Sequence, residues 1–579
     1  MHKGLGFWDC LVVVAYMVWM LAIGVYYSRR QTDTSEYFLG RRGMNWFIVG
    51  ISTMATLVST ITYLTTPGEI ITNGFGVLWA QVPVYLAFFV IGYLIIPKIM
   101  AHKGIVSGYQ LLERQFGMSI RQAAALLFVM TRITWTGLVV YTCSRAVSQM
   151  TGWPLEWVIL AVGIVTISYT TMGGIRAVII TDVTQAFILF GGALLVVGFA
   201  MWTAHSLTGW WPNFHDPIVR SGLAWPKVKW FSFDLTDRIT VVGIIFMYFV
   251  WWVATASSDQ LAIQRYLSTK DARAARKSFL TNAVSNTLVG TMLVLCGVAL
   301  LGYFLQNTGL IPPVTELLAN KPGVLHDATQ KLATMTPVQQ KVYTLKAGGD
   351  DVFPWFIAHI LPAGLSGVLI AALFSAAMSS VSSGVNSITT VLMVDFRRIF
   401  TGNLDERGKV RRARIIGVTV GMVAILVSFT QHLIKGNFME VAQKINGFFI
   451  APMAALFLMA FFIKRVTKQG AWVSIFVGFL VGVYVSYYME ISEALIGHEL
   501  LLSFMYILPF CRLISSLLLL ALALSSPVRV SFMYILPFSL IGSVLVGYLV
   551  SLLYPSPPGQ RENGGMADRR PESSVTSKQ

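Results

Sequence analysis

The sequence is poor in charge, cysteine and histidine, and each shortage excludes a class of protein. Asp, Glu, Lys and Arg make up 12% of the 579 residues, too few for the surface of an ordinary water-soluble domain of this size. The four cysteines, Cys10, Cys143, Cys296 and Cys511, have neither disulfide nor metal-ligand spacing. The eight histidines are scattered, and no phosphate-binding loop or nucleophile–base pair is visible. We therefore expect neither an enzyme nor a cofactor-dependent protein.

Long apolar runs dominate what is present. Hydrophobic residues make up 55% of the chain, and runs of about 20 apolar residues recur along its length. We count fourteen candidate membrane spans, which predict a single transmembrane domain over 1–554. The segment 353–392 is too long for one crossing, and we expect a break at Pro362-Ala363-Gly364. The tail 555–579 is rich in Pro, Gly, Ser and Arg and is predicted to be disordered.

The net charge of +17 indicates a membrane orientation rather than a nucleic-acid partner. Lys and Arg gather in alternate loops, and such loops face the cytoplasm. This places the N-terminus outside and the Arg397–Arg414 loop inside. Arg29-Arg30 follow the first span in place of a cleavage site, so that span is expected to be permanent. We expect a multi-pass protein of the plasma membrane, or of the inner membrane if it is bacterial, with the lipid bilayer as a partner.

An eight-residue repeat complicates the C-terminal end. Ser503–Phe510 and Ser531–Phe538 both read SFMYILPF, which indicates a local duplication or an assembly error rather than a function. Arg512 adds a charge inside the expected span 503–525. The expected number of transmembrane helices is therefore thirteen or fourteen, and the side of the C-terminus stays open.

A stripe of hydroxyls marks one apolar span. Ala376, Ser379, Ser380 and Ser383 fall at i, i+3, i+4 and i+7, so they share one helical face. Neutral oxygens on one face suit a small, hard, monovalent cation. The alternative is close helix packing, in which the hydroxyls bond back to their own helix.

Two ionisable residues inside spans are also candidates for function. Asp182 could belong to an ion site, or it could be solvated at a helix end or paired with Arg176. Arg132 has the planar fork that suits the carboxylate of a solute. It could equally form a structural pair with Glu69 or Asp259.

Several motifs in order resemble the sodium/solute symporter family, which includes the sodium/glucose cotransporters. The resemblance runs from about residue 7 to 490. It is carried by the following motifs: Ser35–Met44, Tyr169–Val178 followed by Thr181–Gln185, Asp259-Gln260 with Gln264-Arg265, Ser268–Asp271, and Ala371–Ser387 with Asp395.

The resemblance implies an all-α polytopic membrane protein with a leucine-transporter-like fold of two inverted five-helix repeats. The repeats would occupy 45–203 and 238–463, after a leading helix at 7–27 and before accessory helices at 470–554. Such folds place solute and ions near the midplane, beside broken helices. We expect Pro67-Gly68 to end or kink the first core helix.

The resemblance also implies ion sites. One sodium site would use the carbonyls of Ala55, Val58 and Ala376 and the hydroxyls of Ser379 and Ser380. A second would use Asp182, Ser382 and Ser383. Sodium would then be the coupling ion, and no other cofactor is implied.

Solute contacts carried over from the family fall on Ser59, Thr62, Gln81, Arg132, Trp252 and Gln443. Thr62 and Trp252 replace residues that sugar-carrying relatives use, which disfavours glucose and galactose. Arg132 with Ser59, Thr62 and Gln81 resembles the arrangement that holds acidic sugars. We expect a sodium-coupled symporter that imports a small organic solute, an anionic sugar or carboxylate, by alternating access. The alternative is a symporter-like sensor without net transport, and the oligomeric state is left open.

Overall fold

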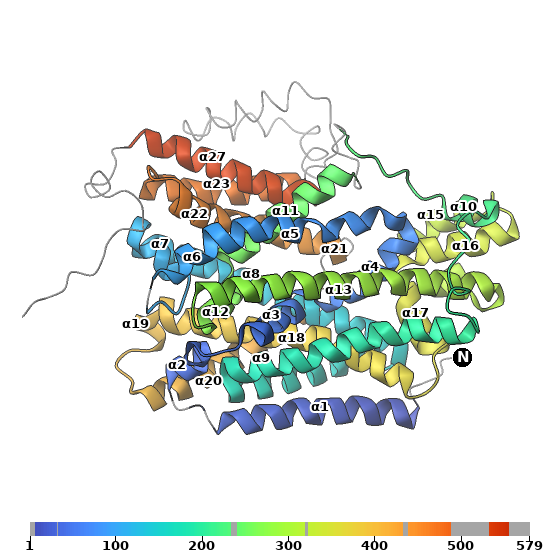
Figure 1. Ribbon diagram of the computed structural model, residues 1–579, viewed down its shortest axis with the longest axis horizontal. Coiled ribbons are helices and arrows are strands. Elements are labelled where there is room, and N and C mark those ends of the chain that lie inside the picture. The colour runs from blue at the N-terminus through green and yellow to red at the C-terminus, as the bar shows by residue number, and fades with distance from the viewer. Residues whose placement is uncertain are drawn as a thin grey trace, which may run out of the picture.

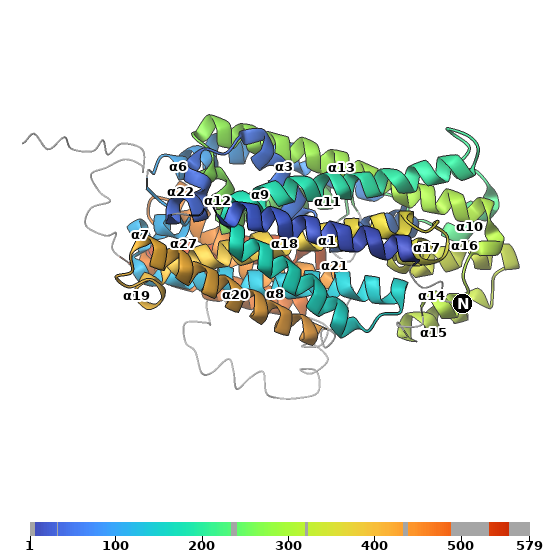
Figure 2. The ribbon, with the colours of Figure 1, turned by 90° about the horizontal axis from the view of Figure 1, so that it is seen from below.

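A computed structural model describes residues 6–29, 31, 33–102, 104–232, 240–318, 322–431, 438–487 and 532–554. These residues form helices and connecting loops, with one isolated bridge between Lys229 and Thr240. Most of the long helices run along the long axis of the molecule (Figure 1). Short helices close its two ends, with α7 and α19 at one end and α10, α14, α15 and α16 at the other (Figures 1 and 2).

The helices of the first half, in chain order, are α1 (Phe7–Ser28), α2 (Thr34–Leu39), η1 (Gly40–Arg42), α3 (Trp46–Leu57), α4 (Thr60–Asn73), η2 (Gly74–Gln81), α5 (Pro83–Val90), η3 (Ile91–Ile95), α6 (Ile96–Met100), α7 (Tyr109–Phe116), α8 (Met118–Thr151), α9 (Leu155–Thr203) and α10 (Pro217–Leu223). Those of the second half are α11 (Val241–Ser258), α12 (Gln260–Ser268), α13 (Ala272–Gln306), η4 (Thr308–Leu310), α14 (Val314–Leu317), α15 (Pro322–Leu332), α16 (Pro337–Gly348), η5 (Gly349–Asp351), α17 (Val352–His359), α18 (Leu365–Asp395), α19 (Arg397–Phe400), α20 (Glu406–Thr430), α21 (Phe438–Ile445), η7 (Asn446–Ile450), α22 (Ala451–Phe462), α23 (Lys468–Ser486), η8 (Phe532–Tyr534) and α27 (Ile535–Leu552).

The part of the chain that the structure describes contains 11 helical stretches long and apolar enough to cross a membrane. One of them, α9, has 49 residues, more than twice the roughly 20 needed for one crossing. It breaks at Gly174, whose φ of 58° and ψ of −164° suit only glycine. The predicted span 503–525 and the tail 555–579 lie outside the described residues.

Two transmembrane helices are interrupted near their centres. Between α3 and α4, Val58 and Ser59 are extended, with φ/ψ of −81°/90° and −84°/171°. Between α11 and α12, Asp259 is extended at −79°/121°. Each break falls in the first helix of a predicted repeat, where broken helices of this kind expose backbone groups to bound solutes and ions.

Pro67-Gly68 was expected to end or kink the first core helix, and it does not end it, because α4 continues through Pro67 to Asn73. A neighbouring helix packs closely against α4 at this point. A Cβ on Gly297 of α13 would lie 2.7 Å from the Pro67 carbonyl oxygen, so the two helices touch there. The helix breaks instead eight to nine residues earlier, at Val58–Ser59.

The expected break in 353–392 is confirmed. α17 ends at His359, and α18 begins at Leu365 after Gly364, which has a φ of +92°. α18 is buried along nearly its whole length and packs against α1, α8, α9 and α20. It is therefore the central helix of the bundle, and the serine stripe lies in the interior rather than toward lipid.

We expect Gly174→Ala to destabilise the protein by about 1–3 kcal/mol, because its backbone region is strained for any side chain. An added Cβ would also lie 2.9 Å from the Tyr37 carbonyl oxygen. Thermal unfolding of the detergent-purified protein measures the effect. Gly191→Ala in the same helix is the matched control, since its Cβ would meet nothing within 4 Å. Equal melting temperatures for the two variants would contradict this account.

Candidate functional site

The serines of α18 face the broken end of α3. Ser379 Oγ donates a hydrogen bond of 2.8 Å to the Ala55 carbonyl and lies 3.3 Å from the Ala376 carbonyl oxygen. Ser380 Oγ donates to the Thr56 carbonyl at 2.8 Å. By contrast, Ser375 bonds back to its own helix, at Ala371. The two serines of the stripe therefore reach across to a second helix.

The carbonyl oxygens at the end of α3 and the serine hydroxyls of α18 are both suited to binding a cation. The last carbonyls of a helix have no partner within that helix, and they carry the negative end of its dipole. Ala55 and Val58 lie in the last turn of α3 and at its end, and both are buried. Carbonyl and hydroxyl oxygens can replace the hydration shell of an alkali ion without adding a fixed negative charge. Of the five residues predicted for the first sodium site, Ala55, Ala376 and Ser379 are in direct contact. Ser380 follows Ser379 and is hydrogen-bonded to the Thr56 carbonyl, next to Ala55.

Asp182 is fully buried and lies against the same two helices. Its Oδ2 accepts hydrogen bonds from Ser52 at 2.6 Å and Thr56 at 3.2 Å in α3, and from Ser383 at 3.4 Å in α18. Neither of the alternative environments holds, because Asp182 is not solvated, and Arg176 pairs with Glu36 at 3.1 Å.

Arg265 of α12 is the functional candidate that sequence reasoning missed. Its guanidinium Nη2 lies 2.8 Å from Asp182 Oδ2, 2.5 Å from Thr56 Oγ1 and 2.6 Å from Ser383 Oγ. Its side chain is 1% exposed, so the charge has no solvent to stabilise it and depends on Asp182. The motif containing Arg265 was visible in the sequence, but nothing in the spacing linked it to Asp182, 83 positions away.

This ion pair changes the environment of the predicted second sodium site. Ser383 Oγ donates a hydrogen bond to Asp182 Oδ2, whereas Ser382 Oγ donates to the Ser379 carbonyl at 3.1 Å. Asp182 Oδ1 is buried without a hydrogen-bond partner. A fixed cation therefore occupies one oxygen of the carboxylate, and the other oxygen keeps its capacity to accept.

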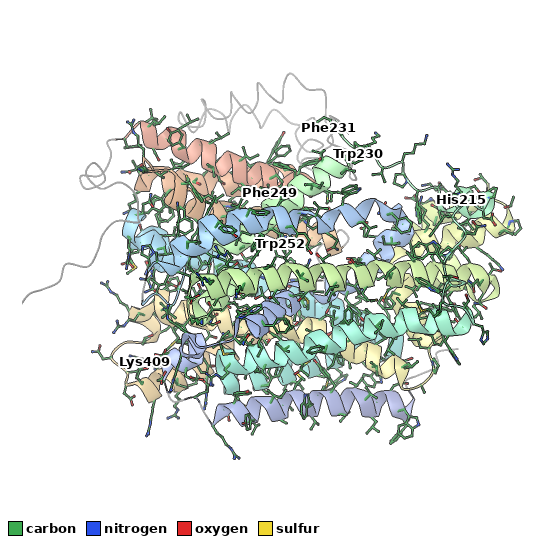
Figure 3. The ribbon with its side chains drawn as sticks, viewed as in Figure 1. His215, Trp230, Phe231, Phe249, Trp252 and Lys409 are labelled. Carbon is green, nitrogen blue, oxygen red and sulfur yellow. The ribbon has the colours of Figure 1, made fainter. Side chains whose placement is uncertain are left out.

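A cavity of ≈ 200 Å³ lies beside the break in the first core helix. Its walls come from the end of α3, from α4, η2, α8, α11 and α13, and from the α21–η7 segment and η8. Five of the six residues predicted to contact solute line it: Ser59, Thr62, Gln81, Trp252 and Gln443. Trp252 lies midway along the long axis, while Lys409 and His215 lie toward opposite ends (Figure 3). The cavity is therefore near the middle of the transmembrane region.

Arg132 does not line this cavity. Its Nη2 forms an ion pair with Asp259, at the break between α11 and α12, and both side chains are buried. Asp259 Oδ1 also accepts from the Leu261 amide at 2.9 Å and so caps α12. The structure thus shows the structural pairing that the sequence left open as one of two roles for Arg132. Glu69, the other partner considered, lines the cavity and accepts from Asn73 at 2.6 Å.

Sequence reasoning did not select four further lining residues, Glu69, Trp135, Asn286 and Asn446, as solute contacts. The amides of Asn286 and Asn446 stand alone in apolar spans, and that isolation was a usable signal. Glu69 is the acidic residue among the described lining residues, and none of these is Lys or Arg. A negative solute group would therefore depend on dipoles rather than on a side-chain cation.

The first turn of α4 supplies such dipoles. Val58, Ser59, Ile61 and Thr62 all line the cavity, and α4 begins at Thr60. The first N–H groups of a helix have no partner within it and carry the positive end of its dipole. The Ser59 hydroxyl makes no capping bond to this turn. One break thus presents acceptors toward the serines of α18 and donors toward the cavity.

Comparison with known proteins agrees with this architecture. The model of the Sodium:solute symporter family matches residues 37–478, and the chain belongs to this family. It is a multi-pass membrane protein that couples the movement of an organic solute to sodium, and it is a transporter rather than an enzyme. Sodium is its coupling ion.

Individual relatives extend the comparison. The chain is 28% identical to the sodium/sialic acid symporter SiaT of Proteus mirabilis over 82% of this chain and 88% of the relative. It is 26% identical to the sodium-coupled monocarboxylate transporter 1 of Mus musculus over 83% of this chain and 73% of the relative. A solved structure of a Na⁺-coupled sialic acid symporter in a substrate-bound outward-open state superposes with a TM-score of 0.70, at 23% identity, covering 95% and 99% of the two chains. The leucine-transporter-like fold expected from the sequence is confirmed.

We expect Arg132→Met to lower the stability of the protein by about 3–5 kcal/mol, because it leaves the buried Asp259 charge without a partner. The double variant Arg132→Met/Asp259→Asn removes both charges and keeps a cap for α12, so it should recover much of this loss. Thermal unfolding and folded yield measure both effects. A stable Arg132→Met protein that loses only acidic solutes would instead assign Arg132 to solute binding.

Proposed function

We propose that this chain imports an acidic sugar or a related carboxylate together with sodium. One observation carries the proposal: the break at Val58–Ser59 turns the carbonyl end of α3 toward Ser379 and the amide end of α4 toward the cavity. The first end suits a cation and the second suits an anion. Both ligands therefore bind to the two halves of one interrupted helix.

The sodium site consists of the carbonyls of Ala55, Val58 and Ala376 and the hydroxyls of Ser379 and Ser380. The 2.8 Å contact between Ser379 and Ala55 supports it, because it brings oxygens of α3 and α18 within reach of one ion. The ion joins α3 to α18, so it favours conformations in which these helices are close. The second sodium site, with Asp182, Ser382 and Ser383, is supported by the unpartnered Asp182 Oδ1.

The solute binds in the cavity, with its carboxylate at the first turn of α4. Ser59 and Thr62 add hydroxyl donors there, and Gln81 and Gln443 supply amides for the hydroxyls of a sugar. Trp252 offers a flat apolar face for a ring. Likeness to symporters of sialic acid and to monocarboxylate transporters supports an acidic solute.

The chain lies in the plasma membrane, or the inner membrane of a bacterium, with its N-terminus outside. The positive-inside pattern supports this orientation. The N-terminal end of the described chain lies at the same end of the molecule as α15 and α16, opposite α7 and α19 (Figure 1). Coupling follows if sodium and solute favour the same outward-facing conformation, since only differential affinity shifts a conformational equilibrium.

We expect Ser380→Ala and Ser379→Ala to raise the sodium concentration that gives half-maximal uptake. Each variant removes one oxygen ligand, and the loss of one such contact weakens binding by about 1–2 kcal/mol, or roughly five- to thirtyfold. Sodium-dependent uptake into proteoliposomes measures this. Thr389→Val, which removes a hydroxyl that bonds back to the Val385 carbonyl within α18, is the control. An unchanged sodium dependence in both variants would exclude the site.

We expect Gln81→Glu to abolish uptake of acidic solutes while sparing neutral analogues. The substitution keeps the shape of the side chain but places a negative charge on the wall of the cavity, and a like charge there disfavours an anionic solute. Uptake competition with an acidic sugar and with its neutral amide measures the selectivity. Gln330→Glu, on exposed α15, is the matched control. Equal losses for both solutes would argue against an anionic substrate.

A further inference from the structure

The leading helix α1 precedes the two predicted repeats and runs along α9 and α18 (Figure 2). Its outer side carries exposed apolar residues such as Trp8, Val18 and Trp19, as expected of a lipid-facing surface. Its inner side is buried and includes two polar residues, Asp9 and Tyr16. Buried polar groups in a membrane helix need partners, and both partners lie on or beside α18.

Asp9 caps the N-terminus of α18. Its Oδ1 accepts from the amides of Gly364 and Gly367, each at 2.7 Å, and its Oδ2 accepts from the Gly6 amide at 3.0 Å. Gly364 has no side chain with which to cap the helix itself. A carboxylate at this end complements the helix dipole. A Cβ on Gly367 would lie 2.6 Å from the Asp9 Cα, so the two backbones are in direct contact.

Tyr16 contacts α18 near its middle. Its hydroxyl donates toward Met378 Sδ at 3.6 Å and accepts from Gln185 Nε2 at 3.1 Å. Tyr169 completes the cluster by donating to the Met378 carbonyl at 3.1 Å. Met378 immediately precedes Ser379. Tyr16 and Tyr169 therefore hold Met378, which is the neighbour of the proposed sodium ligand Ser379. They contact one face of α18, and α3 contacts another.

We propose that α1 positions α18 for sodium binding, with Asp9 fixing the start of the helix and Tyr16 fixing it beside Ser379. The proposal rests on the sodium site proposed above. Ligand oxygens must be held within about 0.5 Å, and neighbouring residues outside the site provide that restraint. Two contacts on one helix, 11 or more residues apart, restrain both its displacement along the membrane normal and its rotation.

The test compares Tyr16→Phe with Tyr26→Phe, the same substitution on the outward-facing side of α1, where Tyr26 is 54% exposed. Three quantities are measured for each variant: the half-saturating sodium concentration, the solute KM at saturating sodium, and the increase in melting temperature on replacing KCl with NaCl. We expect Tyr16→Phe to raise the half-saturating sodium concentration about two- to tenfold, the effect of losing one hydrogen bond. The solute KM at saturating sodium should stay at the wild-type value, as should all three quantities in Tyr26→Phe.

Asp9→Asn provides a second variant, because its amide oxygen can still accept from the Gly364 and Gly367 amides but lacks the charge. It should shift the sodium dependence less than Asp9→Leu does. In the double variant Tyr16→Phe/Ser379→Ala, the effects should be less than additive in free energy, because both act on the same site.

Two results would overturn the inference. One is a wild-type sodium dependence in folded Tyr16→Phe and Asp9→Leu, and the other is a fall in maximal uptake alone with unchanged sodium affinity. Either result, together with a shifted sodium dependence in Ser379→Ala, rejects only the role of α1. An unchanged sodium dependence in both Ser379→Ala and Ser380→Ala rejects the sodium site itself.

Discussion

The structure depends on the contact between the interrupted helix α3–α4 and the serine face of α18. An interruption in the middle of a membrane is costly unless the freed backbone groups find partners. Here the hydroxyls of Ser379 and Ser380 donate hydrogen bonds to the carbonyls of Ala55 and Thr56, at the end of α3. A dehydrated sodium ion can take over the same oxygens. In the proposed sodium site, ion binding and helix packing would use one set of groups, and the ion would change how firmly the two helices are joined.

Two buried ion pairs lie beside the interrupted helices, and neither includes a ligand of the first proposed sodium site. Arg265 pairs with Asp182 and Arg132 pairs with Asp259, and both pairs join helices from different parts of the sequence. Such pairs contribute little net stability, but breaking them leaves an uncompensated buried charge. They therefore restrict the arrangements of α8, α9 and α12 to those that keep each pair together. The first proposed sodium site would then use neutral oxygens alone, which suits an ion that must be released after each cycle.

Much of the architecture could be predicted from the sequence. Apolar runs located the spans, and the serine spacing marked the buried face of α18. Backbone breaks were harder to locate: Pro67 does not end α4, and the helix is interrupted at Val58–Ser59, where no proline or glycine stands. The candidate functional site could be predicted only in part, for the same reason. Thr62 and Gln81 line the cavity as expected. Asp259 was one of the partners considered for Arg132, but the choice among them, and Arg265 as the partner of Asp182, depend on tertiary packing that no local pattern encodes.

The most direct measurement of the central claim is an experimental structure determined in sodium and again with potassium replacing sodium. The account predicts a density peak in sodium alone, coordinated by the Ala55 carbonyl and the Ser379 hydroxyl, with α3 and α18 drawn together around it. Unchanged direct hydrogen bonds from both serines to α3 in sodium, with no ion between them, would contradict it.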